Sequence, residues 1–261
     1  MCFSSNSCNK ISVIFHNLKF DFTIFDVQNK KMKYFLLLLI LFPICMQGQT
    51  DFEKAETLFQ QQKFVLAKPL FEKFLTQNPN HLKTIEYLGD INGNFKNWDK
   101  SIFYYKKLKD LKPDQANYFY KYGGAVGMKA KESNKFVALS LIGDMKSAFE
   151  KAILLNPKHI EARWALIEFY LILPGIVGGS EKKANHYAEE LSKISPVDGY
   201  LAKGKIAEHF NRYKEAEKQY SFAFKIGKSA TSYQKLVDLY NNKLRQPEKA
   251  MLLKKEYEKQ S

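Results

Sequence analysis

The sequence predicts an all-α fold in which antiparallel helix pairs stack one after another. Three observations carry this prediction. Apolar residues recur at helical spacings of three and four along most of the chain. One position, which we call the mark, returns on these segments at a spacing near 34 residues, and in four cases a proline follows twelve residues later. The marks are Ala67, Ser101, Met145, Ala184, Ala216 and Ala250, and the prolines are Pro79, Pro113, Pro157 and Pro196.

The segment 82–115 illustrates how one helix pair is expected to form. Gly89 lies on the apolar face of a first helix, and a turn follows near residue 95. Ser101 and Tyr105 lie on the apolar stripe of a second helix, which must end before Pro113 because proline has no N–H to donate. We expect the small Ser101 to let the two helices approach closely, with the Tyr105 ring filling the gap beside it.

The period resembles that of the tetratricopeptide-repeat (TPR) family, whose units are 34 residues long. The pair Leu88-Gly89 and the runs Ala67…Phe71…Pro79 and Phe149…Ala152…Pro157 are similar to the consensus of that family. The resemblance covers about 50–261. It implies an all-α, TPR-type right-handed α-solenoid of about five to six antiparallel helix pairs, with a shorter last pair at 231–261. An unrelated helical bundle with regularly placed Ala and Pro is the alternative.

The resemblance also implies where a partner binds, because in this family the first helix of each pair lines the concave side. Carried onto this sequence, the concave face would include Phe52, Glu56, Phe59, Glu86, Tyr87, Asp90, Tyr120, Lys121, Trp164, Glu168, Lys205 and Glu208. Trp164 is the predicted binding hot spot, with core packing as the alternative. Family members that grip a C-terminal carboxylate use a Lys/Asn/Arg clamp, of which Asn117 and Lys121 are only fragments, so a partner of that kind is not expected.

Two insertions interrupt the regular spacing. The first comprises 128–135 and an apolar run at 136–142, which we expect to lengthen the second helix of the third pair by two turns. The second is the loop 173–180, with Pro174, Gly175, Gly178, Gly179 and Ser180. Its glycines allow positive φ, and Ser180 is a good N-cap for the following helix. A partner-binding rim or an anion-binding loop is the functional alternative to a purely structural role.

These insertions, together with the run at 161–170, are similar to those of a group of exported bacterial repeat proteins. The similarity covers about 118–201 and implies no particular activity.

The N-terminal region predicts export. Residues 32–49 read as a signal peptide, with a basic start, an apolar run of about twelve residues and a small polar end. That run is too short to span a bilayer, and a buried core helix is the alternative. We expect Met32 to be the true start and 1–31 to be an upstream extension. A lipoprotein anchored at Cys45 is less favoured because Ile44 precedes it, so the predicted location is periplasmic.

The net charge bears on the class of partner that the chain could bind. The chain carries 41 Lys and Arg against 27 Asp and Glu, a net charge of +14. The lysines are mixed with glutamates, which is typical of a solvated outer face, although anionic lipids or polymers are alternative partners. Nucleic acid is not an expected partner for an exported chain.

No sequence motif points to catalysis. The five histidines are scattered, no metal-ligand spacing occurs, and no nucleophile motif is found, so neither a metal nor a cofactor is predicted. His81 and His159 are expected in the turns that follow the prolines. The pairs Glu86/Asp90 and Glu161/Glu168 are read as surface charge, with acid–base work as the alternative.

The sequence therefore predicts a non-enzymatic TPR scaffold or adaptor in the bacterial envelope, which binds a protein or peptide on its concave helical face. One alternative is a basic protein that docks onto anionic lipid or polymer. The other is a ligand-binding protein that uses the Pro-Gly-Gly loop.

Overall fold

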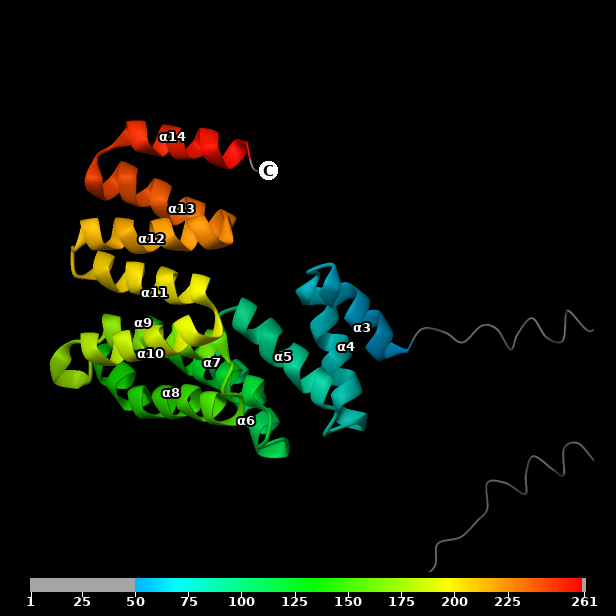
Figure 1. Cartoon of the computed structure of the whole chain (residues 1–261). Helices are drawn as coiled ribbons and strands as arrows, with labels where there is room; N and C mark the ends of the chain where they lie inside the picture. Colours follow the sequence, from blue (N-terminus) through cyan, green and yellow to red (C-terminus); the bar gives the residue numbers. More distant parts are fainter. Residues whose placement is uncertain (1–49, 260–261) are drawn as a thin grey trace, which may run out of the picture. The chain divides into compact units, whose positions relative to one another are not determined.

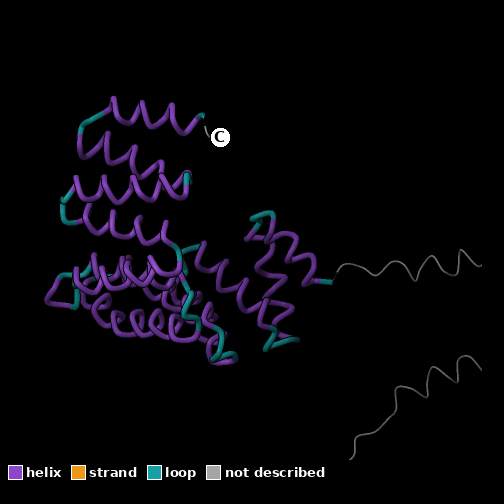
Figure 2. Tube along the Cα trace, viewed as in Figure 1, coloured by secondary structure: helices purple, strands orange, loops and turns teal. Residues whose placement is uncertain are grey.

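The computed structural model describes residues 50–259, and all the regular structure in this part of the chain is helical (Figures 1 and 2). Twelve α-helices form six consecutive pairs in the described residues. The pairs are α3 (Asp51–Gln60) with α4 (Phe64–Gln77), α5 (Leu82–Asn94) with α6 (Trp98–Leu111), α7 (Ala116–Glu132) with α8 (Lys135–Leu155), α9 (Ile160–Ile172) with α10 (Glu181–Ile194), α11 (Pro196–His209) with α12 (Tyr213–Gly227), and α13 (Ala230–Leu239) with α14 (Pro247–Glu258). The predicted all-α fold of five to six helix pairs is confirmed.

Prolines set several helix boundaries. The helices α4, α6 and α8 each end two residues before Pro79, Pro113 and Pro157, respectively. Pro196 instead occupies the first position of α11, where its missing N–H costs nothing. Ser195 therefore closes α10 and caps α11 at the same time, through a hydrogen bond from the backbone N–H of Asp198 to its hydroxyl.

Two helices begin with histidine caps. His81 Nδ1 accepts the backbone N–H of Thr84, and His159 Nδ1 accepts that of Ala162. The prediction that both histidines lie in the turns is confirmed, but their capping role was missed. His159 is buried, and this burial lowers its pKa, which keeps the imidazole neutral and able to accept.

The marks lie at the contact between the two helices of a pair. The five small marks are all buried, and the Ser101 hydroxyl donates a hydrogen bond to the carbonyl of Gly89 over 3.0 Å. Met145 is the exception in size, and a glycine on the facing helix compensates for it. A Cβ added at Gly127 of α7 would come within 2.7 Å of the Met145 sulfur. The methionine side chain therefore occupies the space that the side chain of any other residue at position 127 would need.

Glycines of the first helices also seat the aromatic rings that follow the marks. A Cβ at Gly89 would come within 2.6 Å of the Tyr105 ring, and one at Gly204 within 2.4 Å of the Tyr220 ring. Gly123 has the same relation to Phe149, at 2.9 Å. The predicted filling of the gap by an aromatic is therefore confirmed, with the glycine as its necessary counterpart.

The hydrophobic core consists of several clusters of buried side chains that follow one another along the stack. Buried side chains of consecutive pairs belong to the same clusters, for example Phe71 with Leu88, and Phe149 with Leu166. Trp164 contacts both of the clusters nearest the C-terminus. Each unit therefore depends on its neighbours for burial, which is the general organisation of a repeat protein.

The predicted upstream extension at 1–31 and the predicted signal peptide at 32–49, including Met32 and Cys45, lie outside the described residues. Export accordingly stays a prediction, and so does the less favoured lipid anchor at Cys45. Within residues 50–259, no helix combines the length and the apolar character needed to cross a membrane.

Candidate functional site

We use the term first-helix face for the surface made by α3, α5, α7, α9, α11 and α13, on which the predicted partner-binding residues lie. At its N-terminal end, the Phe59 and Tyr87 rings are 4.3 Å apart, and Tyr87 is almost fully buried. The Tyr87 hydroxyl donates to the Glu56 carboxylate over 2.7 Å, and the Lys83 ammonium lies 2.5 Å from the same oxygen. Hydrogen bonds from Lys83 and Tyr87 lower the pKa of Glu56. These side chains join the first two pairs to each other.

The next predicted residues form a closed ion-pair cluster. The Lys121 ammonium of α7 lies 2.8 and 2.9 Å from the two Asp90 oxygens and 2.7 Å from Glu86 Oε1. The Tyr105 hydroxyl donates to the same Asp90 carboxylate. Burial on its own lowers the pKa of Lys121, but the attraction of Asp90 and Glu86 outweighs it, so the net shift is upward. Both carboxylates thus share the Lys121 ammonium, and the cluster joins the second pair to the third.

Two further aromatics of the predicted face, Tyr120 and Trp164, are half-buried and already in contact with other groups. The Tyr120 ring centroid lies 6.0 Å from that of Phe149 and 5.1 Å from that of His159. Trp164 packs between two clusters, and its indole N–H donates to Asp198 over 2.9 Å. The core-packing alternative left open for Trp164 therefore describes its observed contacts.

The C-terminal part of the first-helix face is more open and cationic. Glu168 of α9 forms an ion pair with Lys205 of α11. Beyond this pair lies a hollow of about 360 Å³, which we call the lysine hollow. It is lined by Lys205, Glu208, His209, Asn211, Lys235 and Lys243.

The charges of the lysine hollow are unbalanced. Its one carboxylate, Glu208, already accepts the Tyr220 hydroxyl over 2.9 Å. Lys235 and Lys243 form no ion pair within the described part of the chain, and Lys243 also lies over the Tyr213 ring. Sequence reasoning placed Lys205 and Glu208 on this face but missed Lys235 and Lys243. Both lysines could have been found by continuing the first-helix pattern into the last pair, which the sequence indicated only as a shorter pair at 231–261.

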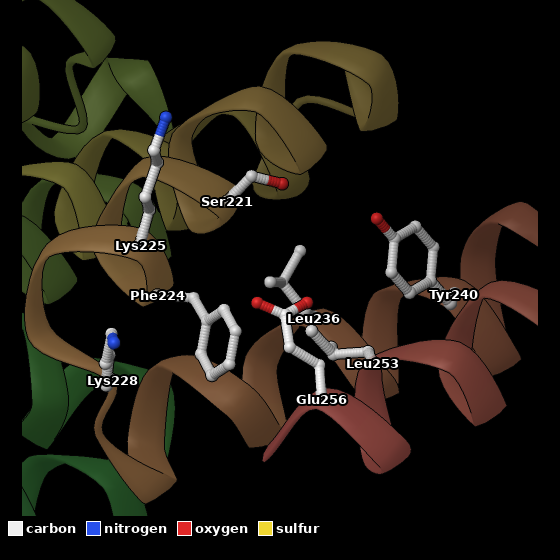
Figure 3. Close-up of a pocket in the computed structure, with 8 residues that line it drawn as sticks. All are labelled: Ser221, Phe224, Lys225, Lys228, Leu236, Tyr240, Leu253 and Glu256. Atoms are coloured by element: carbon white, nitrogen blue, oxygen red, sulfur yellow. The ribbon is translucent and has the colours of Figure 1, made fainter. Parts of the chain in front are cut away.

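A second hollow, of about 380 Å³, opens between α12, α13, α14 and the π-helical turn η3 (Tyr240–Leu244). Figure 3 shows its apolar floor of Phe224, Leu236 and Leu253, with Lys225 and Lys228 to one side. Ser221, Tyr240 and Glu256 complete the lining. Burial and the nearby Glu217 carboxylate raise the pKa of Tyr240 to about 12.

The last pair opens in this way because of the turn that joins its helices. The π-helical turn and the left-handed Arg245, at φ 55°, widen the connection, and α13 and α14 pack less extensively than the helices of the other pairs. The floor of this hollow is shared with the core of the last two units, and no pattern in the sequence predicted it.

The insertion loop is a compact turn. Residues Gly175–Val177 form one 3₁₀ turn, and Gly178 alone among the loop glycines has positive φ, at 110°. Gly179 is required by close approach, because a Cβ there would lie 1.8 Å from the Leu173 carbonyl oxygen. The Ser180 hydroxyl accepts the Lys183 N–H, which confirms the predicted N-cap. Of the three loop glycines, which could all take positive φ, only Gly178 does so.

The first insertion adds helix, as expected. The run 136–142 lies inside α8, which has 21 residues where α6 and α10 have 14. Among the described residues, no group of three His, Cys, Asp or Glu side chains is placed to hold a metal ion.

Solved structures share this fold. The crystal structure of MamA protein matches at 22% identity and a TM-score of 0.53, covering 67% of this chain and 88% of its own. TTC0263, a thermophilic TPR protein of Thermus thermophilus, matches at 16% identity and 0.56, covering 74% and 97%. A TPR protein from Parabacteroides merdae matches at 14% and 0.57, covering 82% and 81%.

Sequence comparison adds no closer relationship. No protein-family model matches the chain, and no curated protein matches it. The structural likeness establishes the fold and leaves the activity open. The helix pairs and these matches together show that the chain has the tetratricopeptide-repeat fold.

Proposed function

We propose that this chain is a non-enzymatic protein-interaction scaffold that binds an acidic peptide segment of a partner protein in the lysine hollow. The TPR-like fold supports a scaffold in general. The observation that carries the finer proposal is the hollow itself, which gathers three lysines and a histidine from α11, α13 and η3 around a single, already hydrogen-bonded carboxylate.

The chemistry of the hollow favours carboxylate ligands. Lys235 and Lys243 offer ammonium donors that are not engaged by acidic side chains of the described chain, and Asn211 offers an amide. Hydrogen bonds from ammonium groups to carboxylates are shorter and stronger than those between neutral groups. A segment with two or more Glu or Asp side chains would satisfy both lysines.

The N-terminal half of the first-helix face contributes in another way. Glu86, Asp90 and Lys121 satisfy one another, and Phe59 and Tyr87 are packed together. A partner would have to break these contacts to use the groups. We therefore place the binding site toward the C-terminal end of the predicted face, beyond Glu168.

We further propose that the protein is exported and acts in the bacterial periplasm, on the basis of the signal-peptide pattern at 32–49. N-terminal sequencing of exported protein tests this proposal. A mature end near residues 49–51 is expected, and an intact Met1 would contradict both export and the start at Met32.

Peptide binding by the full chain tests the proposed function. The probe is a fluorescein-labelled decapeptide of alternating glutamate and alanine, with a glutamine–alanine decapeptide as its neutral counterpart. We expect fluorescence anisotropy to detect the acidic peptide only. The double variant Lys235→Glu/Lys243→Glu should bind it at least about tenfold more weakly, a loss of about 1.4 kcal/mol.

The control variant makes the same change in charge at two lysines outside the lysine hollow. Lys214 and Lys218 are exposed on α12, outside the lysine hollow, and form no ion pair within the described chain. The variant Lys214→Glu/Lys218→Glu should bind nearly as well as the parent. Equal losses in both double variants would show that only the overall positive charge attracts the peptide, and the proposed site would be wrong.

A further inference from the structure

The two insertions lie at the same edge of the third and fourth pairs. The helices α8 and α10 both end two residues before a proline, so the longer α8 begins seven residues before the level at which α10 starts. At 1.5 Å per residue this overhang is about 10 Å long. The loop 173–180 leads into the start of α10, and the second helices of consecutive antiparallel pairs begin at the same edge of the stack, so the loop and the overhang of α8 project from the same edge. We call residues 131–142 and 172–183 the insertion tip.

The insertion tip carries unusually exposed apolar side chains. Ile176 is 94% exposed and Phe136 is 86% exposed, which makes them the two most exposed large apolar side chains between residues 50 and 259. Ile172 is 73% exposed, and Val137 and Leu139 are also exposed. Large apolar side chains gathered on one protruding end are a feature of surfaces that enter an apolar environment.

Positive charge surrounds these side chains. Lys131, Lys135 and Lys182 are exposed, and none of them forms an ion pair within the described chain. The acidic neighbours are already neutralised: Glu132 pairs with Lys96 and accepts the Trp98 indole N–H, and Glu181 pairs with Arg212.

Asp144, further along α8, accepts only a long contact of 3.4 Å from the Tyr122 hydroxyl and lies beyond the tip. The insertion tip therefore combines protruding apolar groups with unpaired cationic groups.

We propose that the insertion tip docks onto a bilayer surface that contains anionic lipids. Phe136 and Ile176 enter the boundary between headgroups and acyl chains, while the lysines contact the lipid phosphates. This combination of apolar insertion and attraction to anionic headgroups is how interfacial segments bind. The apolar side chains protrude among exposed lysines without ion pairs, which matches the acyl boundary and the phosphates of an anionic lipid surface.

The test reads the tip locally, because the apolar run at 34–45 could bind vesicles by itself. The full chain is prepared as Ile176→Trp and, as a matched control, as Val65→Trp on α4, a position that is 74% exposed. The parent chain is measured in parallel, and the signal of its own Trp98 and Trp164 is subtracted. Each is mixed with phosphatidylcholine vesicles, with and without phosphatidylglycerol, and with the same vesicles made from brominated lipids. We expect a blue shift and bromine quenching for the tryptophan at 176 with anionic vesicles only, and no change for the one at 65.

Charge variants complete the test. Lys131→Gln/Lys135→Gln/Lys182→Gln should weaken the vesicle response at 176 by about tenfold or more, since each lysine near an anionic surface contributes to binding. The triple variant Lys214→Gln/Lys218→Gln/Lys255→Gln, exposed on α12 and α14, should leave it unchanged. Circular dichroism confirms that helix content is retained in every variant.

Three outcomes would overturn the proposal: no response at 176, the same response at 65, or an equal response to vesicles without phosphatidylglycerol. A response at 176 to lipid-free protein extract but not to vesicles would also overturn it and assign the tip to a protein partner. The lysine hollow lies on other helices, so peptide binding and vesicle binding can fail independently.

Discussion

Replacing Gly204 by alanine tests the packing rule on which the helix pairs depend. An alanine in the middle of an ordinary helix is about 1 kcal/mol more favourable than glycine. At Gly204, however, the new Cβ would lie 2.4 Å from two atoms of the Tyr220 ring, closer than real carbon contacts allow. That ring is fully buried, and its hydroxyl is held by Glu208, so it cannot swing away freely.

The two effects oppose each other, and their magnitudes decide the outcome. Overpacking of a filled core costs typically about 1–3 kcal/mol, and a displacement of about 1 Å in a fully buried ring belongs at the upper end. Subtracting the gain in helix propensity of about 1 kcal/mol leaves a net loss of about 2 kcal/mol. Urea unfolding of the full chain, followed by circular dichroism, measures this loss as a lower midpoint.

Two controls separate the clash from propensity. Gly124 and Gly143 lie in α7 and α8 with nothing within 4 Å of an added Cβ, so Gly124→Ala and Gly143→Ala should stabilise by about 0.5–1 kcal/mol. In a Tyr220→Leu background, the extra cost of Gly204→Ala should disappear, as a double-mutant cycle would show. A Gly204→Ala chain as stable as the parent would refute the packing rule.

Three further predictions follow from individual contacts. Lys121→Met should destabilise by about 1–2 kcal/mol in urea unfolding, because it leaves Asp90 and its neighbouring carboxylate close together without their ammonium; a midpoint that stays unchanged would be contrary to the proposed cluster. The lowered pKa of His159 predicts that stability falls as pH drops below about 6.5, since the unfolded imidazole then takes up a proton that the folded one resists. In a His159→Asn chain, which keeps a cap but cannot titrate, this part of the pH dependence should vanish. Gly178→Ala should cost about 1–2 kcal/mol because of its positive φ, whereas Gly175→Ala should cost little, and equal costs would argue against the turn geometry.

The regular part of the fold could be predicted because it is encoded locally. The helices α4, α6 and α8 end just before a proline that follows the mark by twelve residues. A small mark with an aromatic four residues later indicates a contact between neighbouring helices. Met145 shows the limit of this reasoning. Its compensating partner, Gly127, is on the preceding helix, and no spacing rule within α8 reveals it.

The candidate site shows a second limit. The predicted residues do lie on the first helices, but Tyr87 binds Glu56 and Lys121 binds Asp90, in each case 31 residues apart. Such contacts between successive units decide whether a charged side chain is available to a partner. The sequence alone does not reveal which side chains make them. The lysine hollow was missed for a related reason, because it forms only where α11 and α13 are placed next to each other.

The central claim is that the lysine hollow selects an acidic segment, and a charge-swap measurement tests it most directly. Anisotropy titrations would compare the glutamate–alanine decapeptide with a lysine–alanine decapeptide, on the parent chain and on Lys235→Glu/Lys243→Glu. The swapped chain remains strongly basic overall, so attraction to the whole protein would still favour the acidic peptide. The proposed site predicts that the preference reverses in favour of the lysine peptide. A preference for the acidic peptide that survives the swap would contradict it.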